Sequence, residues 1–192
     1  MARALLLIIL TVTALGAAAD EPVTALIIVD IQEFYFPGGA APLVEPEAAS
    51  VAAGQVLARF RERGDLVVHV QHETEVGMAN HAAVAPRPGE RELVIVKRQV
   101  NAFQDTELLS ALRDRGVNQL VIVGMQTHMC LEAAVRAAVD LGFATTVVSD
   151  ACATRDLTYG DTVVAAADVQ ASTLATLRAY AEVVDAKTYL SR

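Results

Sequence analysis

Short runs of almost wholly apolar residues recur along the chain, and several of them end in a charged residue. A run that is apolar at nearly every position is typical of a strand buried on both faces of a parallel sheet. The runs predict six strands, at residues 25–30, 66–70, 93–97, 119–124, 145–149 and 182–185. A stretch rich in Pro, Gly and charge, residues 72–91, is predicted to be a surface loop.

Segments with helical periodicity lie between the predicted strands. Pro46 suits the first position of a helix and Gly64 suits its end, so residues 46–63 are predicted to be helical. Further helices are predicted at residues 105–115, 127–141 and 162–180. Strands that alternate with helices predict one α/β domain, in which helices cover both faces of a parallel sheet.

The first 19 residues have the composition of a secretory signal peptide. Arg3 supplies a positive charge, residues 4–15 are uncharged and almost wholly apolar, and Ala17 and Ala19 form the small-residue pattern that precedes a cleavage site. We expect cleavage after Ala19, which places residues 20–192 in the periplasm or outside the cell. An uncleaved anchor or a buried first strand is the alternative, although the run is short for a transmembrane span.

Charge and composition narrow the choice of partner. The formal net charge is −8, and removal of residues 1–19, which contain one Arg and no acid, changes it to −8 − 1 = −9. Such an acidic protein is not expected to bind nucleic acids or, once the signal peptide is removed, anionic membranes. Aromatic residues make up only 5% of the chain, which argues against a large stacking surface. A small molecule is the expected partner.

Three polar residues follow predicted strands, at the edge where parallel sheets bind their ligands. Asp30 and Lys97 end the first and third strands, and Cys130 lies in the first turn of the helix after the fourth. The positive end of a helix lowers a thiol pKa, and its free N–H groups can bind an oxyanion. Asp30 would be the general base toward Cys130, with Lys97 stabilising both negative charges. Taken singly, each residue has a plainer interpretation. Cys130 could be a small buried side chain, Asp30 could cap a loop, and Lys97 could be a solvated charge.

The surrounding residues resemble those of the isochorismatase-like cysteine hydrolases, a family that includes nicotinamidases and N-carbamoylsarcosine amidohydrolases. The resembling segments are Leu26–Gln32 (LIIVDIQ), Lys97 with Asn101–Phe103 and Thr106–Leu108, Gly124–Cys130 (GMQTHMC) and Val148–Thr154 (VSDACAT). The resemblance implies a three-layer α/β/α, Rossmann-like domain over residues 20–192 with a six-stranded parallel sheet. It also implies a catalytic triad of Asp30, Lys97 and Cys130.

The resemblance further implies the surroundings of the nucleophile. Relatives have a non-proline cis peptide bond before the cysteine, which by position is Met125–Gln126. The oxyanion hole would then consist of the backbone N–H groups of Gln126 and Cys130. Candidate substrate contacts are Gln32, Tyr35, Phe36 and His128. Gln32 and His128 are open to a second interpretation, in which they hold a loop.

No metal or other cofactor is expected. Nicotinamidases carry an Asp-x-His metal group, and the sequence has no His between Asp30 and His69 to supply its counterpart. His69, His72 and His81 match no metal-binding spacing, so they are interpreted as strand-end and loop histidines. Cys152 is interpreted as a packing residue. Because relatives commonly self-associate, the resemblance also implies a homo-oligomer.

These observations predict hydrolysis of an amide-type C–N bond in a small molecule, with Cys130 as nucleophile. Isochorismatases proper cleave a vinyl ether without needing this cysteine, so its presence favours C–N cleavage. Two alternatives stay open: an ether hydrolase in which Cys130 is idle, and a thiol redox or binding protein in which Cys130 is oxidised. In the redox alternative Cys152 could serve as resolving partner only if the fold brings it close to Cys130.

Overall fold

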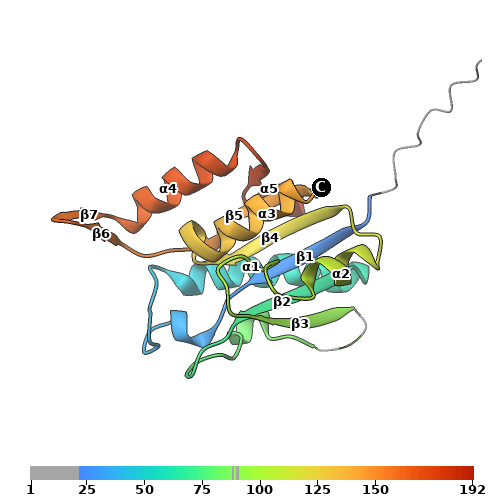
Figure 1. The fold of residues 1–192 in the computed structure, drawn as a ribbon, viewed down its shortest axis with the longest axis horizontal. Coiled ribbons are helices and arrows are strands. Elements are labelled where there is room, and N and C mark those ends of the chain that lie inside the picture. The colour runs from blue at the N-terminus through green and yellow to red at the C-terminus, as the bar shows by residue number, and fades with distance from the viewer. Residues whose placement is uncertain (1–21, 88, 90) are drawn as a thin grey trace, which may run out of the picture.

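A computed structural model describes residues 22–87, 89 and 91–192 of the chain. It contains a six-stranded parallel sheet in the order β3-β2-β1-β4-β5-β8 (Figure 1). The strands are β1 (Thr24–Val29), β2 (Leu66–His72), β3 (Glu92–Lys97), β4 (Gln119–Met125), β5 (Ala144–Ala153) and β8 (Glu182–Val184). The predicted six-stranded parallel sheet is confirmed, and each strand overlaps its predicted range.

Helices cover both faces of the sheet, so the domain has three layers (Figure 1). One side is covered by α2 (Leu108–Arg113), α3 (Glu132–Asp140) and α4 (Ala166–Leu177), and the other by α1 (Pro46–Arg63) and α5 (Ala186–Leu190). Along β1, the side chains of Ala25, Ile27 and Val29 pack into the first layer, and those of Leu26 and Ile28 into the second. This two-sided burial explains why the strand is apolar at every one of these positions.

Three predicted helices differ from the observed ones. The helix predicted at 105–115 is shortened to α2, because Asp105 has a left-handed φ of 54° that a helix does not admit. The helix predicted at 127–141 begins as the π-helical turn η3 (Thr127–Leu131) and continues as α3. The helix predicted at 162–180 is reduced to α4, because β7 (Thr162–Val164) pairs antiparallel with β6 (Leu157–Tyr159) in a hairpin.

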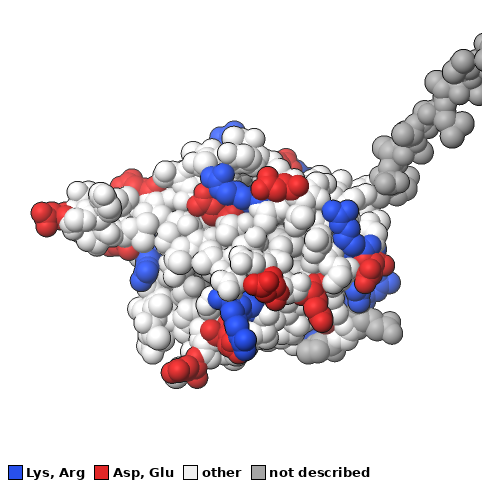
Figure 2. Space-filling model, in the orientation of Figure 1, with Lys and Arg blue, Asp and Glu red and all other residues white. Residues whose placement is uncertain are grey.

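The predicted signal peptide, residues 1–19, lies outside the described residues. Within the described part of the chain, no helix has both the length and the apolar character that a membrane span needs. On the face of the molecule shown in Figure 2, Lys and Arg side chains are interspersed with Asp and Glu and form no continuous basic surface.

The strand order changes direction between β1 and β4. Both β2 and β3 lie on one side of β1, whereas β4, β5 and β8 lie on the other. In open parallel sheets, the carboxyl ends of the strands at such a switch point form the usual ligand crevice. Asp30 directly follows β1 and Cys130 follows β4, so both residues lie at this position.

Candidate active site

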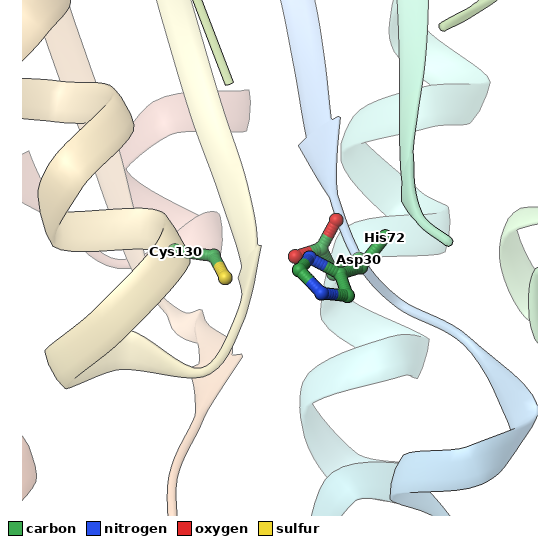
Figure 3. Close-up of side chains that lie close together, drawn as sticks. All are labelled: Asp30, His72 and Cys130. Carbon is green, nitrogen blue, oxygen red and sulfur yellow. The ribbon is translucent and has the colours of Figure 1, made fainter. Parts of the chain in front are cut away.

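Four side chains from separate segments meet at the carboxyl edge of the sheet. Asp30 follows β1, His72 and Lys97 are the last residues of β2 and β3, and Cys130 lies in η3. Asp30 is 0%, Lys97 1% and Cys130 4% exposed. In Figure 3, Cys130 points from the start of its helix toward Asp30 and His72. The three residues named from the sequence therefore lie together in the protein interior.

The Lys97 ammonium is the centre of this cluster. Its Nζ lies 2.7 Å from Oδ2 of Asp30, 2.9 Å from Nδ1 of His72 and 3.3 Å from Sγ of Cys130. An ammonium group has three N–H donors and no acceptor. Two of the three contacts, with His72 and Cys130, are hydrogen bonds, and the contact with Asp30 is an ion pair. His72 was expected to be an ordinary strand-end or loop histidine and was not predicted to belong to the site.

Asp30, His72 and Cys130 are also the kind of group that could hold a metal ion. Their ligand atoms lie within 4.8 Å of one another, and one carboxylate, one imidazole and one thiolate suit Zn²⁺. However, the Lys97 ammonium contacts each of these three side chains. Lys97 thus places a positive charge in contact with all three candidate ligand side chains.

Burial and charge determine the resting protonation of the pair. Burial raises the pKa of the Asp30 carboxyl group, and the positive charge of Lys97 opposes this rise. Burial and the Asp30 carboxylate raise the pKa of the Cys130 thiol to about 12, although Lys97 opposes them. In the resting site, burial and the charge of Asp30 oppose the thiolate that the helix terminus favours. Cys130 is a neutral thiol beside an ion pair, because it is enclosed and faces a carboxylate.

The backbone on both sides of the cluster has unusual conformations. Asp30 has a φ of 50°, which is uncommon for a residue other than glycine. The Met125–Gln126 peptide bond is cis. It directly precedes η3, which carries Cys130, and backbone N–H groups at the start of a helix lack intrahelical acceptors. The assignment of the Gln126 and Cys130 N–H groups as an oxyanion hole stays a proposal.

The candidate substrate contacts that follow β1, Gln32 and Tyr35, have different surroundings in the structure. The Gln32 amide donates to the backbone oxygens of His72 and Met78 at 3.0 and 2.7 Å, and it accepts from the His72 N–H at 2.8 Å. Gln32 thus holds the loop, as in its second interpretation. Tyr35 is influenced by the charges of the cluster. Burial raises the pKa of Tyr35, a hydrogen bond from Gln126 lowers it, and the charges of Cys130 and Asp30 raise it further.

Phe36 and His128 make contacts at the borders of the site. The Phe36 ring stacks on His81, with 3.9 Å between centroids. His128 contacts the Thr154 hydroxyl at 2.6 Å and so joins η3 to the end of β5. Burial and then the positive charge of Arg155 lower the pKa of His128. Tyr35, whose pKa is influenced by Cys130, and His128, which shares η3 with Cys130, therefore remain candidate substrate contacts.

The remaining candidates lie apart from the cluster. The Nε2 atom of His69 is 3.1 Å from Glu92 at the start of β3, and His81 accepts a hydrogen bond from the backbone of Ala83. The Cys152 thiol donates to the backbone oxygen of Val148 at 3.2 Å and is buried in the core. Burial raises its pKa to about 12. Both cysteines are free thiols.

A pocket of about 430 Å³ lies between the start of α1, the end of β5 and α4. Its lining includes Cys152, Thr154 and Gln170, but none of the residues that surround Lys97. Because Thr154 also contacts His128, the pocket adjoins η3. The side chains of Asp30, Lys97 and Cys130 are thus enclosed and lie outside this pocket.

A three-layer α/β domain with a thiol, a carboxylate and an ammonium buried at the switch point has the architecture of an isochorismatase-like hydrolase. The sequence model of the isochorismatase domain matches residues 24–179. The chain belongs to the isochorismatase family, and the family predicted from its sequence is confirmed.

The similarity extends over nearly the whole of several relatives. The isochorismatase family protein YddQ of Bacillus subtilis is 42% identical over 179 residues, which cover 87% of this chain and 98% of YddQ. The maleamate amidohydrolase of Pseudomonas putida is 31% identical, with coverage of 72% and 82% respectively. A crystal structure from Oleispira antarctica, assigned to the isochorismatase hydrolases, has a TM-score of 0.85 and 41% identity, with coverage of 91% and 100%.

Proposed function

We propose that this protein hydrolyses an amide-type C–N bond of a small molecule through a covalent intermediate on Cys130. One observation carries the proposal. A single buried ammonium, Lys97, contacts both the Asp30 carboxylate and the Cys130 sulfur. Negative charge can therefore move between Asp30 and Cys130 while its counter-ion stays in place. This matters because an unpaired charge in a buried site is very costly.

Acylation begins when the Asp30 carboxylate accepts the proton of the Cys130 thiol. The thiolate attacks the amide carbonyl carbon, a C–S bond forms, and the π electrons move to the oxygen. Backbone N–H groups of Gln126 and Cys130 receive this oxyanion. The intermediate then collapses, the C–N bond breaks, and the leaving amine takes its proton from Asp30.

Deacylation repeats these steps with water. The Asp30 carboxylate accepts a proton from water, whose oxygen attacks the thioester carbonyl. Collapse of the second intermediate breaks the C–S bond, and the Cys130 sulfur takes the proton back from Asp30. One amide and one water become one acid and one amine. Burial supports this role of Asp30, because a raised carboxyl pKa makes it a stronger base.

The chemistry of a relative supports an amide as the substrate. The P. putida relative acts as a maleamate amidohydrolase by name, and the enclosure of the triad favours small molecules. Hydrolysis of a vinyl ether has no use for the thiol beside Lys97. Redox chemistry fits less well, since the thiol of Cys152, the candidate resolving partner, donates to Val148 and is buried in the core.

A screen of small amides tests the proposal. Purified protein is incubated with maleamate, nicotinamide, acetamide, urea and a lactam panel, and the release of ammonia or acid is measured. The proposal expects turnover of at least one amide, and its loss in Cys130→Ala. Cys152→Ala is the matched control and should keep its activity. Hydrolysis of isochorismate by Cys130→Ala at the wild-type rate would replace the proposal with ether hydrolysis.

A further inference from the structure

His72 contacts the triad without belonging to it. Its Nδ1 atom lies 2.9 Å from the Lys97 ammonium, and the two residues are paired in register on β2 and β3. Because Lys97 has donors only, Nδ1 of His72 must be the acceptor. The imidazole is therefore neutral and carries its proton on Nε2.

We propose that His72 is a positioning residue that accepts one N–H of Lys97, holds the ammonium in contact with both Asp30 and Cys130, and sets the acid limit of activity. This role rests on the proposed function of the triad. Without His72, the ammonium would have one free donor and could rotate or shift away from the sulfur. The contact with Cys130, at 3.3 Å, is the longest of the three and would be the first to weaken.

Hydrogen bonds with Gln32 fix the position of the His72 backbone. The side-chain amide of Gln32 bonds to both the N–H and the oxygen of His72, at 2.8 and 3.0 Å. Gln32 is itself fully buried and also holds Met78 at 2.7 Å. The residue two positions after Asp30 thereby fixes the end of β2, so that Asp30, His72 and Lys97 keep a constant relative position.

The surroundings of His72 keep it neutral. Burial and the adjacent Lys97 charge lower its pKa from the ordinary value of 6.5, and the carboxylates of Asp30 and Glu73 oppose them. The Cys130 thiol, which lies in η3 and is neutral at rest, also faces His72. As the pH falls through this lowered pKa, His72 gains a proton and loses its acceptor. It also becomes a second cation beside Lys97, so the acid loss of activity attributable to His72 lies below pH 6.5.

Two substitutions distinguish the role of His72 as a hydrogen-bond acceptor from the effect of its protonation. His72→Asn keeps an acceptor oxygen near the position of Nδ1 but cannot titrate, whereas His72→Phe removes the acceptor. We expect His72→Asn to keep most of its kcat at neutral pH, and His72→Phe to lose up to about 10²-fold in kcat with little change in KM. In wild type, Asp30 and His72 both take up a proton in the acid limb. In His72→Asn only Asp30 takes up a proton, so the fall of activity with decreasing pH should be less steep than in wild type.

His81→Asn is the matched control, because His81 stacks on Phe36 outside the cluster. Its pH profile should equal that of wild type. Equal kcat and equal acid limbs in wild type and His72→Phe would overturn the proposal. So would an equal loss in His72→Asn and His72→Phe, since the acceptor would then not be what matters.

A spectroscopic measurement tests the positioning role without any substrate. Long-range ¹H–¹⁵N correlation spectra of the full protein report which imidazole nitrogen carries the proton. We expect the Nε2–H tautomer for His72, a pKa below 6.5, and an upward shift of that pKa in Lys97→Met. An Nδ1–H tautomer, or a His72 titration unaffected by Lys97→Met, would overturn the inference. If the tautomer is as expected but no amide is hydrolysed, the proposed function fails alone.

Discussion

At the scale of single residues, the site depends on burying charges that a stable fold would avoid. Asp30 and Lys97 are both almost wholly inaccessible, and a buried ion pair is often no more stable than apolar side chains of similar size. The sequence identified Asp30, Lys97 and Cys130 because each directly follows an apolar strand or its turn. It did not identify His72, because the strand register that pairs His72 with Lys97 cannot be read from the sequence. The sequence also does not show burial, which together with the Asp30 charge raises the pKa of the Cys130 thiol.

The cost of the ion pair is testable by unfolding in urea. Asp30→Asn and Lys97→Met each leave one buried partner unpaired and should lower the free energy of unfolding by about 3–5 kcal/mol. The double variant leaves no charged group without its partner. Its free energy of unfolding should equal that of wild type or exceed it by up to about 4 kcal/mol. All three should be inactive. A double variant less stable than either single one would show that the pair stabilises the fold.

At the scale of elements, the close approach of β1 and β4 places Asp30 next to η3. The strands pair in register from Thr24 to Val29, and Gly124 ends this pairing with a φ of 140°. A methyl group at Gly124 would lie 2.0 Å from the backbone oxygen of Val29. The strand ends and helix ends were predictable where glycine or proline marks them, as in α1. The β6–β7 hairpin was not, since residues 162–164 have a pattern that also continues into α4.

Replacement of Gly124 by Ala should therefore disrupt the site from its backbone. We expect a loss of more than about 3 kcal/mol in unfolding free energy, because neither strand can move away from the clash. Gly116→Ala is the matched control: its φ is also positive, at 67°, but no atom lies within 4 Å of the added methyl. It should cost only about 1–2 kcal/mol. Equal melting temperatures for the two variants would contradict this account of the β1–β4 contact.

At the scale of the whole molecule, the sheet order brings residues from four distant segments to one edge. β1 and β4 are neighbours at the switch point, and β2 and β3 add His72 and Lys97 from the same side. The alternation of strands and helices was enough to predict this architecture, since parallel strands require crossover connections. The family, confirmed by the match over residues 24–179, accounts for the rest of the topology.

We further propose that the protein acts outside the cytoplasm. The charged start, apolar run and small-residue pattern of residues 1–19 carry this proposal. The mature chain isolated from its native host should begin at Asp20 by intact mass. Full-length protein in the cytosolic fraction would contradict export. An intact mass that retains residues 1–19 in the membrane fraction would instead identify the segment as an anchor.

Detection of the acyl group tests the central claim most directly. Wild-type protein turning over an amide from the screen is quenched in acid, digested with trypsin and examined by mass spectrometry. The two cysteines lie on different peptides, residues 116–136 and 137–155. The account predicts the acyl mass on Cys130 in the first peptide and none on the second. Acyl modification of any other residue, or turnover that continues in Cys130→Ala, would contradict it.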